Sequence, residues 1–205
     1  SKIYSDVESV SNNKKIKLSE AQEIAFMKIS SGLLTKRPVL LQGQTGSGKT
    51  EIYLKLAYEI LEKGKHVLML VPEIALTTQL HRRLEISMGL NVVCIYHSQV
   101  SESQRRDTWL SLLNPSSGAK LVLAARSGVF LPMEHVGLII VDEEHETSYK
   151  QYEPSPRYHA RDVAVWLSNQ IGAGIVLGSA TPSLETFNNS IENKYCRIEL
   201  SERFG

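Results

Sequence analysis

A glycine-rich stretch in the first quarter of the chain has the residue types and spacing of a phosphate-binding loop. Residues 43–50, GQTGSGKT, match the pattern G-x-x-x-x-G-K-[ST]. Glycines allow several backbone N–H groups to point at one phosphate, and a helix that begins here adds the positive end of its dipole. Lys49 would reach the β and γ phosphates, and the Thr50 hydroxyl would hold Mg²⁺. The predicted nucleotide-binding residues are Gly43, Gln44, Thr45, Gly46, Ser47, Gly48, Lys49 and Thr50.

A second group of reactive residues stands at the end of an apolar run. Residues 136–145, VGLIIVDEEH, end in Asp142, Glu143, Glu144 and His145. A phosphate-binding loop needs an acid to complete its metal site, so we expect Asp142 to be a magnesium ligand. Glu143 would then serve as general base for the attacking water, because one carboxylate cannot easily be both ligand and base. The alternative is that the acids are simply solvated at a strand end.

A small hydroxyl-bearing turn follows another apolar run. In residues 178–183, GSATPS, the side chains of Ser179, Ala180 and Thr181 precede a helical segment. Taken alone, this turn is typical of an ordinary helix cap.

An aromatic and basic segment lies between the acids and this turn. Residues 148–162, SYKQYEPSPRYHARD, carry three tyrosines among cationic side chains. Rings can stack on bases while Lys and Arg follow phosphates, so the composition suits a single-strand binder. The residues concerned are Tyr149, Lys150, Tyr152, Arg157, Tyr158, His159 and Arg161. The alternative is a loop whose tyrosines pack on the domain.

The elements that must position these segments follow a regular alternation. Short apolar runs alternate with helix-like segments, and the runs occupy residues 39–42, 66–72, 91–97, 120–126, 136–143, 174–180 and 195–200. Most runs are continuous, which indicates strands buried on both faces, and most intervals can hold a crossover helix. The pattern predicts an α/β fold with a mainly parallel sheet and helices on both faces. In such sheets ligands bind beyond the carboxyl ends of the strands, where the reactive segments stand.

Composition excludes several other classes of protein. The chain has 205 residues, enough for one domain with a substantial core, and its 22% charged and 42% hydrophobic residues are ordinary for a globular protein. No apolar run approaches the roughly 20 residues of a membrane span, so we expect a cytoplasmic protein without a membrane partner. A net charge of +1 gives no overall electrostatic reason to expect nucleic-acid binding. Two cysteines outside any CxxC pair indicate no zinc site.

Taken together, the motifs resemble those of a known family. GQTGSGKT, DEEH and SAT, in this order, look like motifs I, II and III of superfamily 2 helicases. Five longer stretches are similar to the first helicase lobe of the replication-restart helicases, the primosomal protein N′ or PriA family. These stretches are LQGQTGSGKTEIYL, VPEIALTTQL, YHSQVSESQRRDTW, VDEEHETSYKQYEPSPRYHARDVAV and LGSATPSLET. The resemblance implies a RecA-like P-loop fold.

The resemblance also implies an activity and a division of roles. It implies ATP hydrolysis with Mg²⁺ and 3′ to 5′ movement along single-stranded DNA at abandoned replication forks, with single-stranded and forked DNA as partners. Lys49, Asp142 and Glu143 would be catalytic, and Gln22 would contact adenine. Residues expected to couple nucleotide state to DNA are Glu144, His145, Ser179, Ala180 and Thr181. Residues expected to contact DNA are Arg126, Tyr149, Lys150, Tyr152, Tyr158 and Arg161.

The family pattern is not matched everywhere. Ala124 stands where a glycine is expected, and Thr78 stands where proline is expected. Residues 1–17 suggest a linker, and residues 18–205 suggest one ATP-binding lobe cut from a longer protein. A second lobe with an arginine finger and zinc-binding cysteines, an N-terminal DNA-binding domain, and contacts with primosome proteins and single-strand-binding protein are expected outside this sequence.

The sequence is compatible with two other functions. The lobe could act as a nucleotide-gated DNA-binding module without turnover. It could also be a P-loop kinase, which would need a lid and an acceptor pocket, and no segment suggests either.

Overall fold

Seven strands form one sheet in which every neighbouring pair runs parallel. The computed structural model describes residues 16–76 and 78–200, so most of the predicted linker, residues 1–15, lies outside the described part. The strand order is β3-β4-β2-β5-β8-β1-β9. The strands are β1 (Val39–Gly43), β2 (His66–Leu70), β3 (Val93–Tyr96), β4 (Leu121–Ala124), β5 (Val136–Val141), β8 (Gly174–Ser179) and β9 (Cys196–Leu200). All seven predicted strands are confirmed.

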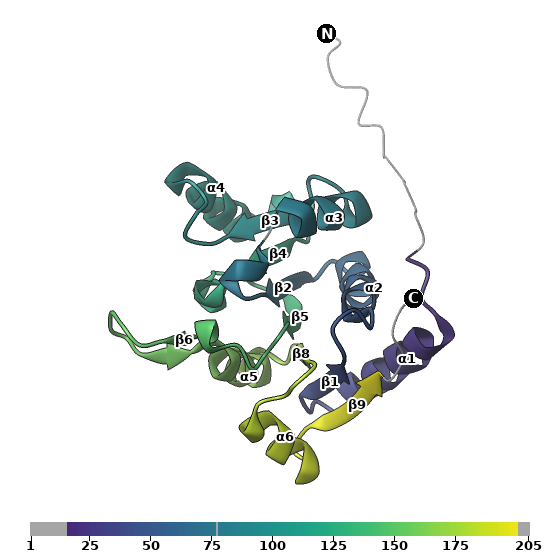
Figure 1. Ribbon diagram of the computed structural model, residues 1–205. Helices are drawn as coiled ribbons and strands as arrows, with labels where there is room; N and C mark the ends of the chain where they lie inside the picture. The colour runs from purple at the N-terminus through teal and green to yellow at the C-terminus, as the bar shows by residue number, and fades with distance from the viewer. Residues whose placement is uncertain (1–15, 77, 201–205) are drawn as a thin grey trace.

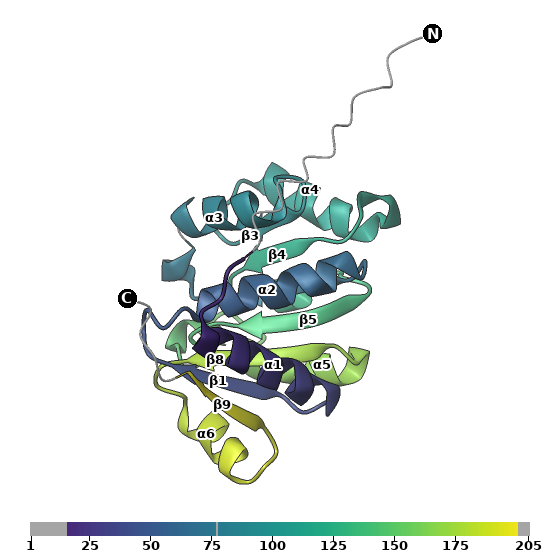
Figure 2. The ribbon, with the colours of Figure 1, turned by 90° about the vertical axis from the view of Figure 1, so that its right-hand side faces the viewer.

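Helices cover both faces of the sheet, as predicted for the α/β class. One face carries α1 (Glu20–Leu34), α2 (Lys49–Glu62) and α3 (Thr78–Met88), which lie in front of the strands in Figure 2. The opposite face carries α4 (Glu102–Leu113) and α5 (Ala160–Ile171), and α6 (Leu184–Ile191) lies beside β9 (Figure 1). Single turns of 3₁₀ helix are η1 (Glu73–Ala75), η2 (Pro115–Ser117), η3 (Arg126–Phe130) and η4 (Thr147–Tyr149).

The continuous apolar runs feed two hydrophobic cores, one on each face of the sheet. Along β2, Val67 and Met69 pack into the core beneath α1, α2 and α3, whereas Leu68 and Leu70 pack into the core beneath α5. Successive side chains of a strand point to opposite faces, so a strand covered on both sides must be apolar throughout. By packing the parallel strands between the helices, the two cores keep the carboxyl ends of β1, β5 and β8 at one edge of the sheet. These strand ends lead into the reactive segments.

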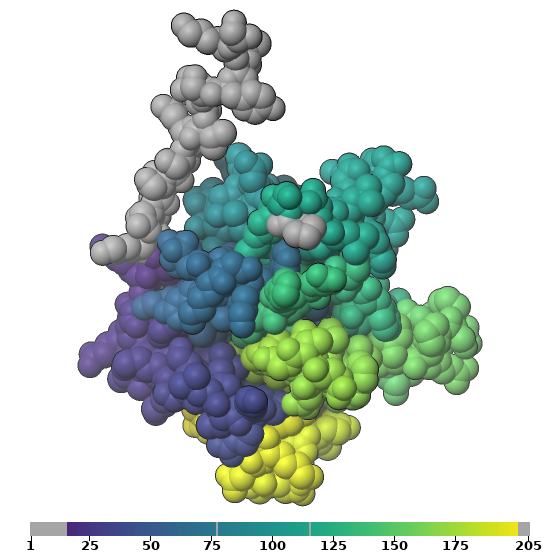
Figure 3. Space-filling view, turned by 180° about the vertical axis from the view of Figure 1, so that it is seen from behind, coloured from purple at the N-terminus to yellow at the C-terminus, as the bar shows by residue number. Residues whose placement is uncertain are grey.

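A short hairpin projects from the body of the molecule and was not predicted. Its strands are β6 (Lys150–Gln151) and β7 (Tyr158–His159), which pair antiparallel, and the segment stands out from the surface in Figures 1 and 3. Gln151 Nε2 donates to the carbonyl oxygens of Pro154 at 2.8 Å and Pro156 at 3.1 Å, which ties the tip to its base. The middle of the aromatic and basic segment, residues 150–159, therefore forms a projecting hairpin.

The unexpected Ala124 is accommodated by a nearby glycine. Ala124 ends β4, and its Cβ occupies the space that a Cβ on Gly128 in η3 would need. A side chain at one position therefore requires glycine at the other, and the departure from the family pattern does not distort β4.

No helix within the described ranges combines the length and apolarity needed to cross a membrane.

Candidate nucleotide site and the segments around it

The glycine-rich loop joins β1 to α2 and lines a cavity of about 350 Å³ at the carboxyl edge of the sheet. The cavity brings together residues from three separate parts of the sequence. They are Thr45, Gly46, Gly48, Lys49, Thr50, Glu51, Arg83, Asp142 and Glu143. Thr50 and Asp142, the predicted magnesium ligands, thus lie at one cavity. A hydroxyl and a carboxylate are hard oxygen donors of the kind that Mg²⁺ takes alongside nucleotide phosphates, so the residues present fit that ion.

Lys49 is held inside the loop by backbone carbonyls. Its Nζ donates to the carbonyl oxygens of Gly43 at 2.9 Å and Gln44 at 3.4 Å, and it lies 3.5 Å from Glu143 Oε1. The side chain is only 7% exposed. A cation buried in this way is positioned for an anion that enters the loop. Of the other predicted loop residues, Ser47 is buried and does not line the cavity.

Gln22, the residue predicted to contact adenine, packs against the phosphate-binding loop. Its side chain is 1% exposed, and Nε2 donates to the carbonyl oxygens of Ser47 at 3.5 Å and Gly48 at 3.3 Å. Its Oε1 accepts from the Ser19 backbone N–H at 2.8 Å as part of a capping box at the start of α1. These protein partners enclose the amide, so in this structure Gln22 braces the phosphate-binding loop, and its contact with adenine stays a prediction.

Gly48 shows why the loop needs glycine. Its φ of 84° lies in the left-handed region, and a Cβ there would collide with the Gln22 amide. Any other residue would both strain the backbone and push Gln22 away from the loop.

Asp142 follows β5 and is fixed by a tyrosine of α2. Tyr53 Oη donates to Asp142 Oδ1 at 3.1 Å, and Tyr53 itself is fully buried. Gly178 of β8 makes this contact possible, since a Cβ there would occupy the place of the Tyr53 hydroxyl. Burial raises the pKa of the Asp142 carboxyl from 3.8 to about 6, the Glu143 charge adds to the rise, and Lys49 and the Tyr53 hydroxyl oppose it. A carboxylate whose pKa is raised at a cavity is a candidate functional residue.

Glu143 has an unusual backbone conformation. Its φ is 46°, in the left-handed region that non-glycine residues rarely adopt. The side chain lies between two cationic groups, with Oε1 3.5 Å from Lys49 Nζ and Oε2 3.7 Å from His145 Nδ1. Strain of this kind is maintained only when the surroundings impose it, and it concentrates at functional sites. The turn directs Glu143 into the cavity beside Asp142.

Glu144 points the other way, into the protein. It is fully buried, and its backbone N–H donates to the Gly178 carbonyl at 3.0 Å. The three adjacent acids therefore have three different environments, and the alternative of simple solvation fails for Glu144.

His145 connects the acids to the hydroxyl-bearing turn. Its Nδ1 and the Ser179 hydroxyl are hydrogen-bonded at 2.7 Å, and the Thr181 backbone N–H donates to the same Ser179 Oγ at 3.0 Å. Ala180 lies between the two bonded residues of the turn. Among the predicted coupling residues, Ser179 thus contacts both His145 and Thr181.

Part of the aromatic and basic segment forms an exposed surface. Arg126, Lys150, Tyr152, Glu153 and Arg157 line a cavity of about 460 Å³ at the base of the hairpin. Lys150 Nζ lies 4.8 Å from the centre of the Tyr152 ring, which is 60% exposed. Tyr158 packs edge-on against the Phe130 ring, with centroids 4.9 Å apart.

Two of the predicted DNA contacts are wrong, because the side chains are buried. Tyr149 is 1% exposed, and its hydroxyl donates to the Asp142 carbonyl at 2.6 Å. Arg161 is 7% exposed, and its Nη1 donates to Glu144 Oε2 at 3.0 Å. Neither ring nor guanidinium can meet a nucleic acid from these positions.

Sequence reasoning missed four residues of the site, which are Tyr53, Gly178, Glu51 and Arg83. Tyr53 had a detectable signal, since it lies one turn after Lys49 on the same helix face. Gly178 is a glycine inside a buried strand, a position that often marks a close approach. Arg83 had no signal: it comes from α3 and forms an ion pair with Glu51 at the cavity only through the tertiary fold.

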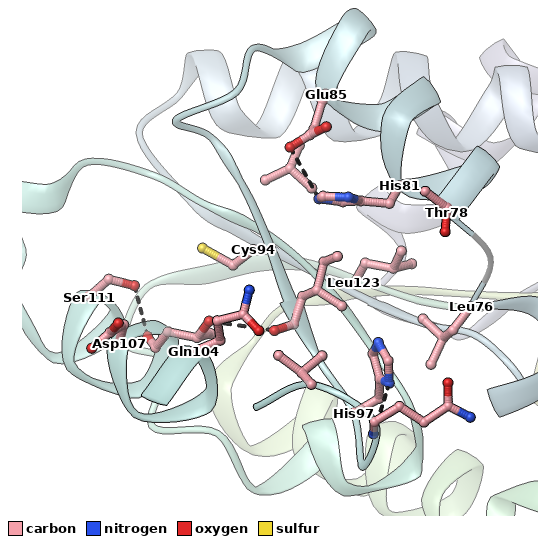
Figure 4. A pocket seen from close by; sticks show the side chains of 15 residues that line it. Leu76, Thr78, His81, Glu85, Cys94, His97, Gln104, Asp107, Ser111 and Leu123 are labelled. Carbon is pink, nitrogen blue, oxygen red and sulfur yellow. Dashed lines mark hydrogen bonds and ion pairs between the residues drawn. The ribbon is translucent and has the colours of Figure 1, made fainter. Parts of the chain in front are cut away.

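A larger cavity lies elsewhere, between α3 and α4 at the edge strand β3 (Figure 4). Its volume is about 640 Å³, and its wall includes the His81–Glu85 pair at 3.3 Å. None of the described residues that line it is Lys or Arg, so it does not complement a phosphate. Within residues 16–76 and 78–200, no group of three or more His, Cys, Asp or Glu side chains is arranged to hold a metal ion.

The fold and the site match one class of protein. Residues 19–190 match the family model of the DEAD/DEAH box helicases, and the chain belongs to this family. The solved structure of RecG bound to a three-way DNA junction superposes with a TM-score of 0.64 at 20% identity, over 92% of this chain and 24% of that one. The predicted RecA-like fold is confirmed.

Within this family, the chain is similar to replication restart protein PriA. It is 46% identical over 188 residues to PriA of Chlamydia pneumoniae, which covers 91% of this chain and 25% of that protein. It is 41% identical over 198 residues to PriA of Haemophilus influenzae, covering 96% and 26%. The predicted resemblance to the first helicase lobe of PriA is confirmed, and the chain spans about a quarter of the length of these curated relatives.

Proposed function

We propose that residues 18–205 form the ATP-binding lobe of a 3′ to 5′ DNA helicase that restarts stalled replication forks. One observation carries the proposal: the phosphate-binding loop, Asp142 and Glu143 share one cavity, and His145 joins them to Ser179. The similarity to PriA supports the fork-restart part. Partners would be single-stranded and forked DNA, primosome proteins and single-strand-binding protein, in the cytoplasm.

The residues of the cavity have distinct tasks in this proposal. Thr50 and Asp142 would hold Mg²⁺, which would neutralise charge on the phosphates. Lys49 leaves the Gly43 and Gln44 carbonyls for the β and γ phosphates. Glu143, then without its lysine partner, orients a water and accepts its proton.

The hairpin supplies the DNA-facing part of the proposal. Tyr152 offers an exposed ring for stacking, and Arg126, Lys150 and Arg157 offer cations for phosphates around the same cavity. Tyr158 lies beside this surface through its contact with Phe130. A kinase would need an acceptor pocket beside the nucleotide cavity. The cations Arg126, Lys150 and Arg157 line a separate cavity, so they do not support the kinase alternative.

The test uses the full-length protein and measures phosphate release and strand displacement. Lys49→Ala is compared with Lys63→Ala, a control at the far end of the same helix. Lys49→Ala should lose nearly all turnover and unwinding, and Lys63→Ala should retain both. Transfer of phosphate to a small molecule, or displacement only from 5′ tails, would contradict the proposal.

A further inference from the structure

Arg83 is a second cation at the nucleotide cavity, and the proposed function gives it no task. It lies on α3 with its side chain 46% exposed, whereas the Lys49 side chain at the same cavity is 7% exposed. Because the β and γ phosphates that reach Lys49 would occupy the depth of the cavity, the rest of a bound nucleotide would lie toward its mouth. Arg83 therefore stands beside the nucleoside end of the ligand.

Glu51 fixes the position of Arg83. It lies in the first turn of α2, directly after Thr50, and its Oε1 is paired with Arg83 Nη2. Its Oε2 lies against the loop, since it would be 3.3 Å from a Cβ placed on Gly48. The ion pair thus holds the Arg83 guanidinium beside the phosphate-binding loop.

The ion pair also determines what Arg83 can offer to a ligand. The Glu51 carboxylate compensates the charge of the guanidinium and places a negative charge near the bound phosphates. A carboxylate binds the edge of a guanidinium, so its two planar faces stay available, and such faces stack on aromatic rings. Arg83 is therefore better suited to a flat base than to another phosphate group.

The rest of the cavity wall leaves this task to Arg83. The described residues that line the cavity include no aromatic side chain. A base gains binding energy when it stacks on a ring or on a guanidinium. Within the described part of the chain, Arg83 is the cavity residue that offers such a surface.

We propose that Arg83 binds the nucleoside end of the nucleotide, with its guanidinium stacked on the purine base. A stacked face takes adenine and guanine alike, so Arg83 adds affinity for a purine nucleotide without selecting between the two. It contacts neither the β and γ phosphates nor the attacking water. This inference rests on the proposed function of the cavity.

The test measures binding to the full-length protein in Mg²⁺ by calorimetry. The ligands are a non-hydrolysable ATP analogue, the matching GTP analogue and inorganic triphosphate. Arg83→Ala should weaken both nucleotides about fivefold or more, as expected when one stacking partner of a base is lost, and should leave triphosphate unchanged. In steady-state turnover, the KM for ATP should rise by a similar factor while kcat stays the same.

Three variants serve as matched comparisons. Arg82→Ala changes the neighbouring arginine of α3, which is exposed and does not line the cavity, and it should bind all three ligands like the wild type. Arg83→Lys keeps the charge without the planar face and should bind nucleotides as weakly as Arg83→Ala. Lys49→Ala removes the phosphate-facing cation and should weaken all three ligands together.

The outcomes distinguish the inference from the function beneath it. In Arg83→Ala, full affinity for ATP, a loss for ATP but not GTP, or an equal loss for triphosphate would overturn the stacking role alone. Recovery of affinity in Arg83→Lys would do the same. If Lys49→Ala bound all three ligands like the wild type, the proposed function of the cavity would fail instead.

Discussion

Replacing Asp142 by Asn should stabilise the metal-free chain while weakening its response to nucleotide. The carboxyl pKa is raised from 3.8 to about 6 by burial beside Glu143. The folded chain therefore binds a proton more readily than the unfolded chain, and the ionised form costs folding free energy. The sign follows: this cost is absent below the unfolded pKa, grows as the pH rises, and is complete above about 6.

The magnitude follows from the pKa difference. Since each pK unit corresponds to about 1.36 kcal/mol, the cost at neutral pH is about 3 kcal/mol. Asp142 still reaches the cavity, so this figure is an upper value. Near pH 4.5 the same linkage leaves a cost of about 1 kcal/mol. The Asp142→Asn substitution removes the cost, and the new amide oxygen can still accept a hydrogen bond from Tyr53.

The assay is urea unfolding of wild type and Asp142→Asn in chelator, across the pH range from about 4.5 to 8. The stability advantage of the variant should grow with pH and then level off. Asp107→Asn, on an exposed side chain of α4, is the control and should show no such trend. Adding Mg²⁺ and ATP should stabilise the wild type more than the variant. A stability difference that does not change with pH would show that the buried Asp142 charge does not destabilise the folded chain.

Three further predictions concern the packing at Gly128, base stacking on Tyr152 and the ATP turnover of the lobe on its own. Gly128→Ala should cost about 1–3 kcal/mol in unfolding free energy through overpacking, and adding Ala124→Gly should restore most of it; no recovery in the double variant would show that Ala124 is not the obstacle. Tyr152→Ala in the full-length protein should weaken single-strand binding by about 1–3 kcal/mol, measured by fluorescence anisotropy, whereas an unchanged affinity would remove this ring from the DNA surface. Residues 1–205 alone should hydrolyse ATP at least about 10³-fold more slowly than a protein of the length of the PriA relatives, because we expect a second lobe to supply an arginine finger; equal turnover would contradict that expectation.

The scaffold and the catalytic edge were predictable because their signals are local. A strand buried on both faces must be continuously apolar, so the apolar run before Asp142 predicts β5 from the sequence alone. The phosphate-binding loop is likewise a contiguous motif whose strand and helix flank it in the sequence. Both predictions needed no knowledge of which segments meet in space.

The errors concern side chains whose partners are distant in the sequence. Arg157 and Arg161 look alike in the segment RYHARD, yet one is exposed and the other is paired with Glu144 inside the protein. Tyr149 and Tyr152 differ in the same way. The hairpin itself was missed because strands of two residues carry no detectable periodicity. Burial of a polar residue is a property of the fold, and no local pattern predicts it.

The division of labour among the adjacent acids can be tested directly with Glu143→Gln in the full-length protein. ATP affinity and single-turnover hydrolysis would be measured with saturating single-stranded DNA. If Glu143 is the general base, binding should remain intact and hydrolysis should fall by about 10²-fold or more. Hydrolysis at the wild-type rate in Glu143→Gln would contradict the assignment on which the account of this site depends.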